Sequence, residues 1–326
     1  MNSQFKVISL FSGCGGSSLG YQMAGGKILL AVEWDKNAVQ IYKLNFPNTS
    51  IYYGDIKNLS IDEILKITKL KIGELDILDG SPPCQGFSIA GKRKFDETRN
   101  YLYKEYIRIL NGLKPKVFVM ENVSGLIQGK MKLIFAEIMK ELKLSGYNVK
   151  CKLMNTMYYG VPQSRKRVIF IGVRNDLGIE PSYPKPKTVP ITVEEAFKNV
   201  ENKTYLIPKK EYIIKQMNTL KPGESLSKYY NKNKFYSCIR IPKDRPSMTL
   251  TSTIFYDISL WHYNEPRNIT IEEAKRIASF PDDFKFIGNY KEQWARIGNS
   301  VPPLFMKAIA EHIKTEILSK IKEETE

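Results

Sequence analysis

The sequence predicts an α/β fold: a doubly wound, mostly parallel sheet joined to a second, smaller and irregular domain. Two observations predict it. In the first half of the 326-residue chain, short runs rich in valine, isoleucine and leucine alternate with longer segments whose apolar residues have helical spacing. From about residue 175 the alternation gives way to a proline-rich stretch, and the following residues show no clear periodicity.

Short apolar runs closed by glycine or acid residues are the predicted strands, and they lie at 5–11, 27–34, 51–55, 75–80, 116–123, 148–155 and 167–174. Amphipathic segments are the predicted helices, at 17–25, 36–46, 61–69, 101–113, 131–147, 269–280 and 302–318. For the last of these, Ser300 is the predicted N-cap. Because ligands of such sheets bind beyond the carboxyl ends of the strands, we expect the segments after the strands to converge on one edge.

The charge balance favours a polyanionic partner. The chain has 50 Lys and Arg against 34 Asp and Glu, a net charge of +16. Residues 201–250 carry much of this surplus, interleaved with tyrosines, which is typical of a nucleic-acid surface. On composition alone, a solvated basic surface explains the surplus equally well.

The cysteines indicate a reducing compartment. Cys14, Cys84, Cys151 and Cys238 are scattered, and with only two histidines in the chain no metal-ligand spacing arises, so no metal site is predicted. The N-terminal apolar run is too short for a secretion signal, and no stretch approaches the ~20 apolar residues of a membrane span. We therefore expect a cytoplasmic protein without a membrane partner, in which all the cysteines except Cys84 serve packing.

Three strand ends predict a nucleoside cofactor. The glycine-rich turn "FSGCGGSSLG" (11–20) follows the first strand and lets a ligand approach the backbone. Glu33 ends the second strand, where an acid accepts hydrogen bonds from ribose hydroxyls, and Trp34 offers a stacking face. Asp55, after the third strand, can accept from an exocyclic amine. Because the glycine spacing departs from the dinucleotide fingerprint, S-adenosylmethionine, which has no phosphates, fits better than a dinucleotide.

Cys84 lies at the end of the fourth predicted strand, directly after Pro82 and Pro83. Free cysteine is usually a buried packing residue, but the prolines stiffen this backbone at the mouth of the sheet, which suits a nucleophile. The reactive form is the thiolate, which a nearby positive field favours. The basic loop just downstream is either a solvated loop or a segment that closes over a bound phosphate chain, and the DNA contacts predicted in it are Ser88, Lys92, Arg93 and Arg99.

The order of the motifs carries a family resemblance. "FSGCGG", "GSPPCQGFS", "MENVSGL", "YGVPQSRKRVIFIG" and "IGNSVPP" resemble the motif series of the DNA (cytosine-5) methyltransferases. The region of resemblance that they mark extends over nearly all of residues 5–174 and reaches both ends of the chain. The length of the variable region before the last motif is similar to that of the bacterial enzymes of restriction-modification systems.

The resemblance implies a methyltransferase-type sheet, S-adenosylmethionine as cofactor and a set of site residues. Cys84 would add to C6 of cytosine, and Glu121 would bind N3 and the 4-amino group. Arg167 would contact O2 and orient Glu121, while Arg165 would support the same pocket. The cofactor residues it implies are Phe11, Gly13, Glu33, Trp34, Asp55, Leu102 and Asn299.

The resemblance also implies that the target base is rotated out of a DNA duplex before it is methylated. It places a catalytic and cofactor-binding domain at 1–180, a target-recognition domain at 181–267, and a hinge with a returning C-terminal helix at 268–326. The predicted DNA contacts of the recognition domain are Arg240, Arg245, Thr249 and Thr251. We expect a monomer whose partners are duplex DNA and a separately acting restriction endonuclease.

Other functions stay open at this point. A cytosine-5 methyltransferase of the same fold acting on tRNA would share the Cys84 and Glu121 chemistry. A nicotinamide-dependent oxidoreductase would share Glu33 and the glycine turn and would bind NAD. It would leave Cys84, Glu121 and Arg167 without a role. A non-catalytic DNA-binding regulator would bind without turnover. The sequence does not indicate which bases flank the target.

Overall fold

The computed structural model describes residues 4–83, 102–201, 203–230, 235, 238–254 and 257–321. It divides into two compact units. Unit 1 comprises residues 1–155, 166–185 and 306–326, and unit 2 comprises 156–165 and 186–305. The sequence analysis placed its boundaries at 180 and 267 and did not foresee the assignment of 156–165 to the second unit.

Within the described part of unit 1, seven strands form one sheet in the order β3-β2-β1-β4-β5-β7-β6. The strands are β1 (Lys6–Leu10), β2 (Lys27–Glu33), β3 (Ser50–Tyr53), β4 (Ile77–Gly80), β5 (Val117–Val123), β6 (Tyr147–Asn155) and β7 (Lys166–Arg174). Neighbours from β3 to β5 pair in parallel, and β7 runs antiparallel to β5 and β6. The predicted mostly parallel α/β sheet is confirmed, and its strand order reverses between β1 and β4, where such sheets bind ligands.

Alternating side chains direct the two faces of the sheet toward different helices. Ile8, Leu10 and Leu78 belong to the apolar core formed with three helices, α3 (Ile61–Thr68), α4 (Leu102–Leu113) and α5 (Met131–Leu144). Ser9 and Asp79 are paired in register between β1 and β4, and both contribute side chains to the opposite face.

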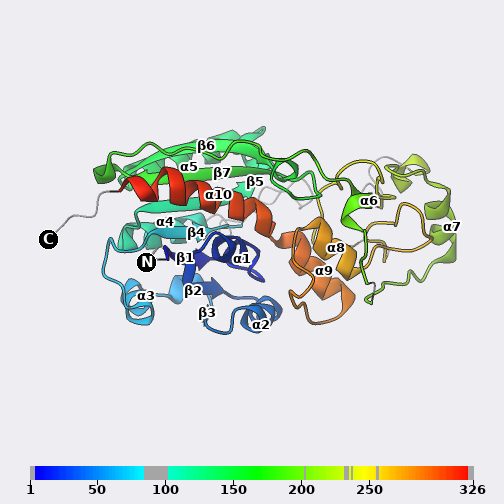
Figure 1. The fold of residues 1–326 in the computed structure, drawn as a ribbon, viewed down its shortest axis with the longest axis horizontal. Coiled ribbons are helices and arrows are strands. Elements are labelled where there is room, and N and C mark those ends of the chain that lie inside the picture. Colours follow the sequence, from blue (N-terminus) through cyan, green and yellow to red (C-terminus); the bar gives the residue numbers. More distant parts are fainter. Residues whose placement is uncertain are drawn as a thin grey trace. The chain divides into compact units, whose positions relative to one another are not determined.

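That opposite face carries α1 (Gly16–Met23), α2 (Lys36–Asn45) and α10 (Pro303–Glu316), with α1 and α10 drawn in front of the strands in Figure 1. Lys314 of α10 donates to the Ala24 carbonyl just after α1, 3.4 Å away, and the Phe5 and Tyr21 rings meet edge to face. Helices therefore cover both faces of the sheet around β1, β2 and β4. A ligand can approach these strands only from their ends.

The described part of unit 2 has shorter helices: α6 (Val193–Ala196), α7 (Glu211–Thr219), α8 (Ile271–Ile277) and α9 (Tyr290–Asn299). Trp261 is fully buried in an apolar cluster with Ile213 and Met217 of α7, and its Nε1 donates to Asn218 Oδ1 at 3.0 Å. The sequence analysis missed α9 and was wrong about Ser300. This residue is the C-cap of α9, with its Oγ bound to the Arg296 carbonyl, and α10 begins at Pro303.

Among the described residues, no helix combines the length and the apolar composition that a membrane crossing requires.

Candidate cofactor site and catalytic pair

The turn after β1 has a backbone that few side chains tolerate. Phe11, Gly13 and Gly15 have φ angles of 54°, 55° and 99°, in the left-handed region. A Cβ on Gly15 would lie 2.3 Å from the Phe46 ring, so the turn is closely packed there. At Gly13 a Cβ would meet nothing described within 4 Å. The turn is therefore supported on one side and open at Gly13, where a ligand can approach the backbone.

Glu33 fixes this turn to the end of β2. Its side chain is buried, with Oε2 accepting from the Gly13 N–H at 2.8 Å. Oε1 accepts from the N–H groups of Trp34 and Asp35, at 2.9 and 2.8 Å. A carboxylate offers about four acceptor positions, so an oriented lone pair remains for a ribose hydroxyl.

Neighbouring strand ends supply the other predicted cofactor residues of unit 1. The Trp34 side chain is 75% exposed, which leaves its ring available for stacking. Asp55 is exposed two residues after β3, which pairs with β2 so that Tyr53 faces Glu33. Leu102 is half-buried at the start of α4, against the apolar core. A fixed acceptor, a free aromatic face and an open glycine turn fit an adenosyl group, so the chain has suitable residues for S-adenosylmethionine.

Farther along the sheet, Glu121 of β5 and Arg167 of β7 form an ion pair. Glu121 lies on β5 opposite Ile169 of β7, and Arg167 is the diagonal neighbour on the same face. Arg167 Nε is 2.7 Å from Glu121 Oε1, and the two side chains are only 11% and 9% exposed. No described residue engages the other carboxylate oxygen, Oε2. The pair therefore presents one oriented acid oxygen at the edge of the sheet.

The residue after Glu121 holds the segment that leads to Cys84. The buried Asn122 amide donates from Nδ2 to the Pro82 carbonyl at 3.2 Å, which ties the end of β5 to the chain beyond β4. Cys84 follows two residues later in the sequence. It lies outside the described residues, as do the predicted DNA contacts Ser88, Lys92, Arg93 and Arg99.

The structure separates Arg165 from Arg167. The sequence analysis treated both as the start of one strand, but β7 begins at Lys166 and Arg165 belongs to unit 2. Arg165 is buried, and its Nη1 donates to the Leu250 carbonyl at 3.0 Å. Its predicted support of the base pocket remains a prediction.

The motif order and the fold agree with a comparison with known proteins. The family model for the C-5 cytosine-specific DNA methylases matches residues 5–315. The chain belongs to this family.

Curated relatives of this methylase are bacterial Type II methyltransferases. It is 37% identical to Type II methyltransferase M1.HphI of Haemophilus parahaemolyticus over 94% of this chain and 86% of that protein. It is 34% identical to M.NgoPII of Neisseria gonorrhoeae over 95% of each protein. With the family match, these relatives identify a DNA cytosine-5 methyltransferase of the restriction-modification type.

Solved structures agree on the fold of the methylase. A DNA modification methyltransferase encoded within an Escherichia coli prophage matches with a TM-score of 0.80 and 26% identity, covering 96% of this chain and 99% of that one. A mutant DNMT2 of Spodoptera frugiperda matches with a TM-score of 0.70 over 95% of this chain and 99% of that one. At 23% identity, the second likeness concerns the fold alone.

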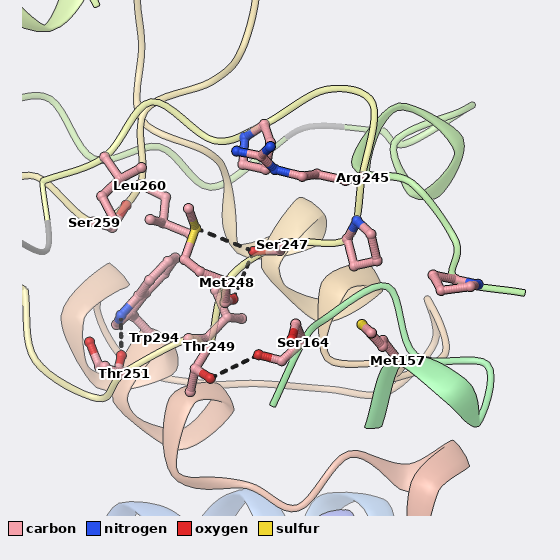
Figure 2. A pocket seen from close by; sticks show the side chains of 15 residues that line it. Met157, Ser164, Arg245, Ser247, Met248, Thr249, Thr251, Ser259, Leu260 and Trp294 are labelled. Carbon is pink, nitrogen blue, oxygen red and sulfur yellow. Dashed lines mark hydrogen bonds between the residues drawn. The ribbon is translucent and has the colours of Figure 1, made fainter. Parts of the chain in front are cut away.

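Unit 2 of the methylase contains a pocket of about 730 Å³, shown in Figure 2. Its lining combines apolar side chains with hydroxyls, and three of the predicted DNA contacts, Arg245, Thr249 and Thr251, take part. Thr249 Oγ1 donates to the Ser164 carbonyl at 3.0 Å, which fixes its rotamer. The exposed Arg245 lies along the opposite edge of the pocket.

Arg240, the fourth predicted DNA contact of this region, donates hydrogen bonds to backbone carbonyls within unit 2. Its Nε donates to the Tyr263 carbonyl at 3.1 Å, and Nη1 donates to the carbonyls of Asn218 and Leu220, both at 3.0 Å. The guanidinium thus joins the C-terminal end of α7 to the chain near Tyr263. A contact with DNA remains a prediction for its other nitrogen.

The sequence analysis did not identify two residues of α9 that hold the Thr251 segment. Trp294 Nε1 donates to the Thr251 carbonyl at 2.8 Å (Figure 2). A Cβ on Gly298 would lie 2.6 Å from the carbonyl carbon and oxygen of Thr251, so helix and loop pack backbone to backbone. Asn299, a predicted cofactor contact, is the next residue of the helix. The available signal was a glycine inside a helical segment, four residues after a tryptophan.

Proposed function

We propose that this chain transfers a methyl group from S-adenosylmethionine to C5 of a cytosine flipped out of a specific duplex DNA sequence, through a covalent bond between Cys84 and C6. The observation that carries the proposal is the buried pair of Glu121 and Arg167 at the end of β5. A fixed acid beside a fixed guanidinium suits a pyrimidine, whose N3 and 4-amino group lie next to its O2.

Cytosine C5 is too weak a nucleophile to take a methyl group from a sulfonium directly. In the proposed reaction the Cys84 thiolate gives an electron pair to C6, and the C5–C6 π electrons make C5 nucleophilic. Glu121 gives a proton to N3, where negative charge develops, and accepts a hydrogen bond from the 4-amino group, while Arg167 holds Glu121 and contacts O2. After C5 gains the methyl group, solvent accepts the C5 proton. The electrons of that C–H bond restore the double bond and expel the Cys84 thiolate. The proton on N3 returns to Glu121 when Cys84 leaves.

The cofactor supplies an electrophilic methyl group on a sulfonium when it is bound. Glu33, pinned by three backbone N–H groups, accepts from the ribose hydroxyls, and the exposed Trp34 ring stacks on the adenine. Asp55 accepts from the exocyclic amine, and the open backbone at Gly13 admits the donor closely. By resemblance, Phe11, Leu102 and Asn299 complete this set.

Unit 2 is proposed to bind the duplex. Extruding a base costs a few kcal/mol, which contacts with the DNA backbone must offset. Arg245, Thr249 and Thr251 line one pocket of this unit and supply a cation and two hydroxyls. We further propose that the protein acts as a monomer and that a separate restriction endonuclease recognises the same DNA sequence.

Incubation with labelled S-adenosylmethionine and either duplex DNA or a tRNA pool tests the proposal. We expect label in DNA alone, and bisulfite sequencing of DNA from cells expressing the chain should show one recurring sequence around the methylated cytosine. Glu121→Gln should lose methyl transfer, whereas the exposed Glu63→Gln should not. Label in tRNA alone would contradict the proposed substrate, and an active Glu121→Gln enzyme would contradict the proposed mechanism.

A further inference from the structure

Asp79 is a buried carboxyl group that the proposed reaction does not use. It lies on β4 in the centre of the sheet, where the strand order reverses, with 1% of its surface exposed. Its Oδ2 accepts from Ser9 Oγ at 3.1 Å, and its Oδ1 accepts from the Tyr21 hydroxyl at 3.2 Å. Ser17, in the first turn of α1, also donates to it.

These partners connect the two halves of the proposed active site. Ser17 and Tyr21 belong to α1, the helix that directly follows the glycine turn of the cofactor site. Asp79 itself is five residues before Cys84, on the strand that leads into the two prolines. A single carboxylate thus joins the cofactor side of the sheet to the nucleophile side.

The hydrogen-bond pattern favours the ionised form. A carboxylate accepts from all three hydroxyls at once, whereas a protonated carboxyl must donate its own proton to one of them. The Tyr21 side chain is fully buried, so solvent cannot replace Asp79 as the acceptor of its hydroxyl proton. Protonation therefore breaks or reverses one of the bonds that hold α1.

We propose that ionised Asp79 is a positioning residue for methyl transfer, which holds α1 and the glycine turn against β4 so that the cofactor site keeps its shape. The proposal rests on the proposed function, because it assumes that the glycine turn binds S-adenosylmethionine. Asp79 touches neither the cofactor nor the target base.

Asp79 titrates in the neutral range. Burial raises its pKa to about 7, opposed by the hydrogen bonds of Ser9 and Tyr21 and assisted by the charge of Glu121. The groups that face or act on it come from five elements, β1, α1, α2, α4 and β5, and are Ser9, Ser17, Tyr21, Tyr42, Tyr106 and Glu121. Cofactor binding should therefore weaken as the pH falls below about 7.

Calorimetric titration of S-adenosylmethionine into the protein without DNA, between pH 6 and pH 8, tests the proposal. The wild type should bind more weakly at pH 6 than at pH 8. Asp79→Asn keeps the shape but not the charge, so its affinity at pH 8 should fall roughly tenfold, the size of one charge-assisted hydrogen bond, and should change little with pH. Tyr21→Phe removes one hydrogen-bond donor, so its affinity for S-adenosylmethionine at pH 8 should lie between those of the wild type and Asp79→Asn.

The matched control is Asp76→Asn, which removes a carboxylate from the residue just before the same strand. Asp76 binds the Lys6 N–H and Lys116 Nζ, away from α1, so this variant should bind S-adenosylmethionine as the wild type does, with the same pH dependence. Thermal unfolding of each variant establishes that it is folded. An Asp79→Asn protein with wild-type affinity and pH dependence, made from a wild type that methylates DNA, would overturn this proposal and leave the proposed function intact. A wild type that transfers no methyl group would instead refute the proposed function.

Discussion

Gly298→Ala should destabilise unit 2, although alanine is the better helix former. In an isolated helix the change would stabilise by about 1 kcal/mol. Here the added Cβ would lie 2.6 Å from the Thr251 carbonyl carbon and oxygen and 2.8 Å from the Ser252 nitrogen. Ordinary contact begins at 3.4 Å, so α9 and the loop must separate by about 0.8 Å. Overpacking of this kind costs about 1–3 kcal/mol, and we expect a net loss of about 1 kcal/mol.

Urea unfolding and DNA binding measure the two consequences. Because the Thr251 segment must move, affinity for duplex DNA should fall roughly tenfold, the equivalent of about 1.4 kcal/mol. Gly125→Ala is the matched control, since a Cβ there meets nothing described within 4 Å and the φ angle is ordinary. A Gly298→Ala protein as stable as the Gly125→Ala protein, with unchanged DNA affinity, would refute the packing explanation.

The acid–arginine pair, the basic surface and the buried carboxyl each give a further prediction. Arg167→Ala leaves the nearly buried Glu121 charge without its partner and should cost about 3 kcal/mol in urea unfolding, whereas Lys228→Ala, at an exposed pair, should change little; equal unfolding midpoints would contradict this. The logarithm of DNA affinity should fall by about 0.9 per neutralised phosphate for each tenfold rise in salt concentration, and the slope should be shallower for Arg245→Ala. An affinity that does not change with salt would exclude the DNA-binding role of unit 2. Burial raises the pKa of Asp79 to about 7, from about 3.9 in an unfolded chain, so the folded protein binds this proton more tightly than the unfolded chain does. The free energy of unfolding should therefore fall by roughly 4 kcal/mol from pH 4 to pH 7 and stay constant above that. Asp79→Asn should lose that component, and a variant with the wild-type pH dependence of stability would show that another group is responsible.

The strands and the strand-end residues could be predicted because each depends on local pattern. Continuous runs of valine, isoleucine and leucine mark strands buried on both faces, and parallel pairing places their ends at one edge. Glu33 and Glu121 follow from that rule together with the motifs in which they occur. Both lie within the strands that the sequence analysis predicted: Glu33 is the last residue of β2, and Glu121 is two residues before the end of β5.

The remaining features depend on tertiary contacts that leave no periodic signal. Arg165 and Arg167 are two residues apart, yet one contacts Leu250 and the other Glu121, because the chain passes between units at residue 165. Arg240 is a cation in a basic segment, which suggested a DNA contact. In the structure its guanidinium donates to backbone carbonyls and so connects two segments of unit 2. Asp79 looks like any strand residue until Ser9 and Tyr21 are found beside it.

A covalent trap tests the central claim most directly. A duplex carrying 5-fluorocytosine at the target, incubated with the protein and S-adenosylmethionine, should become covalently attached, because fluorine cannot leave as a proton and Cys84 is not expelled. Peptide mapping should locate the DNA on Cys84, and Cys84→Ala should give neither adduct nor methylation while still binding the cofactor. An enzyme that methylates ordinary DNA yet forms no adduct with this duplex, or forms one at another residue, would contradict the account.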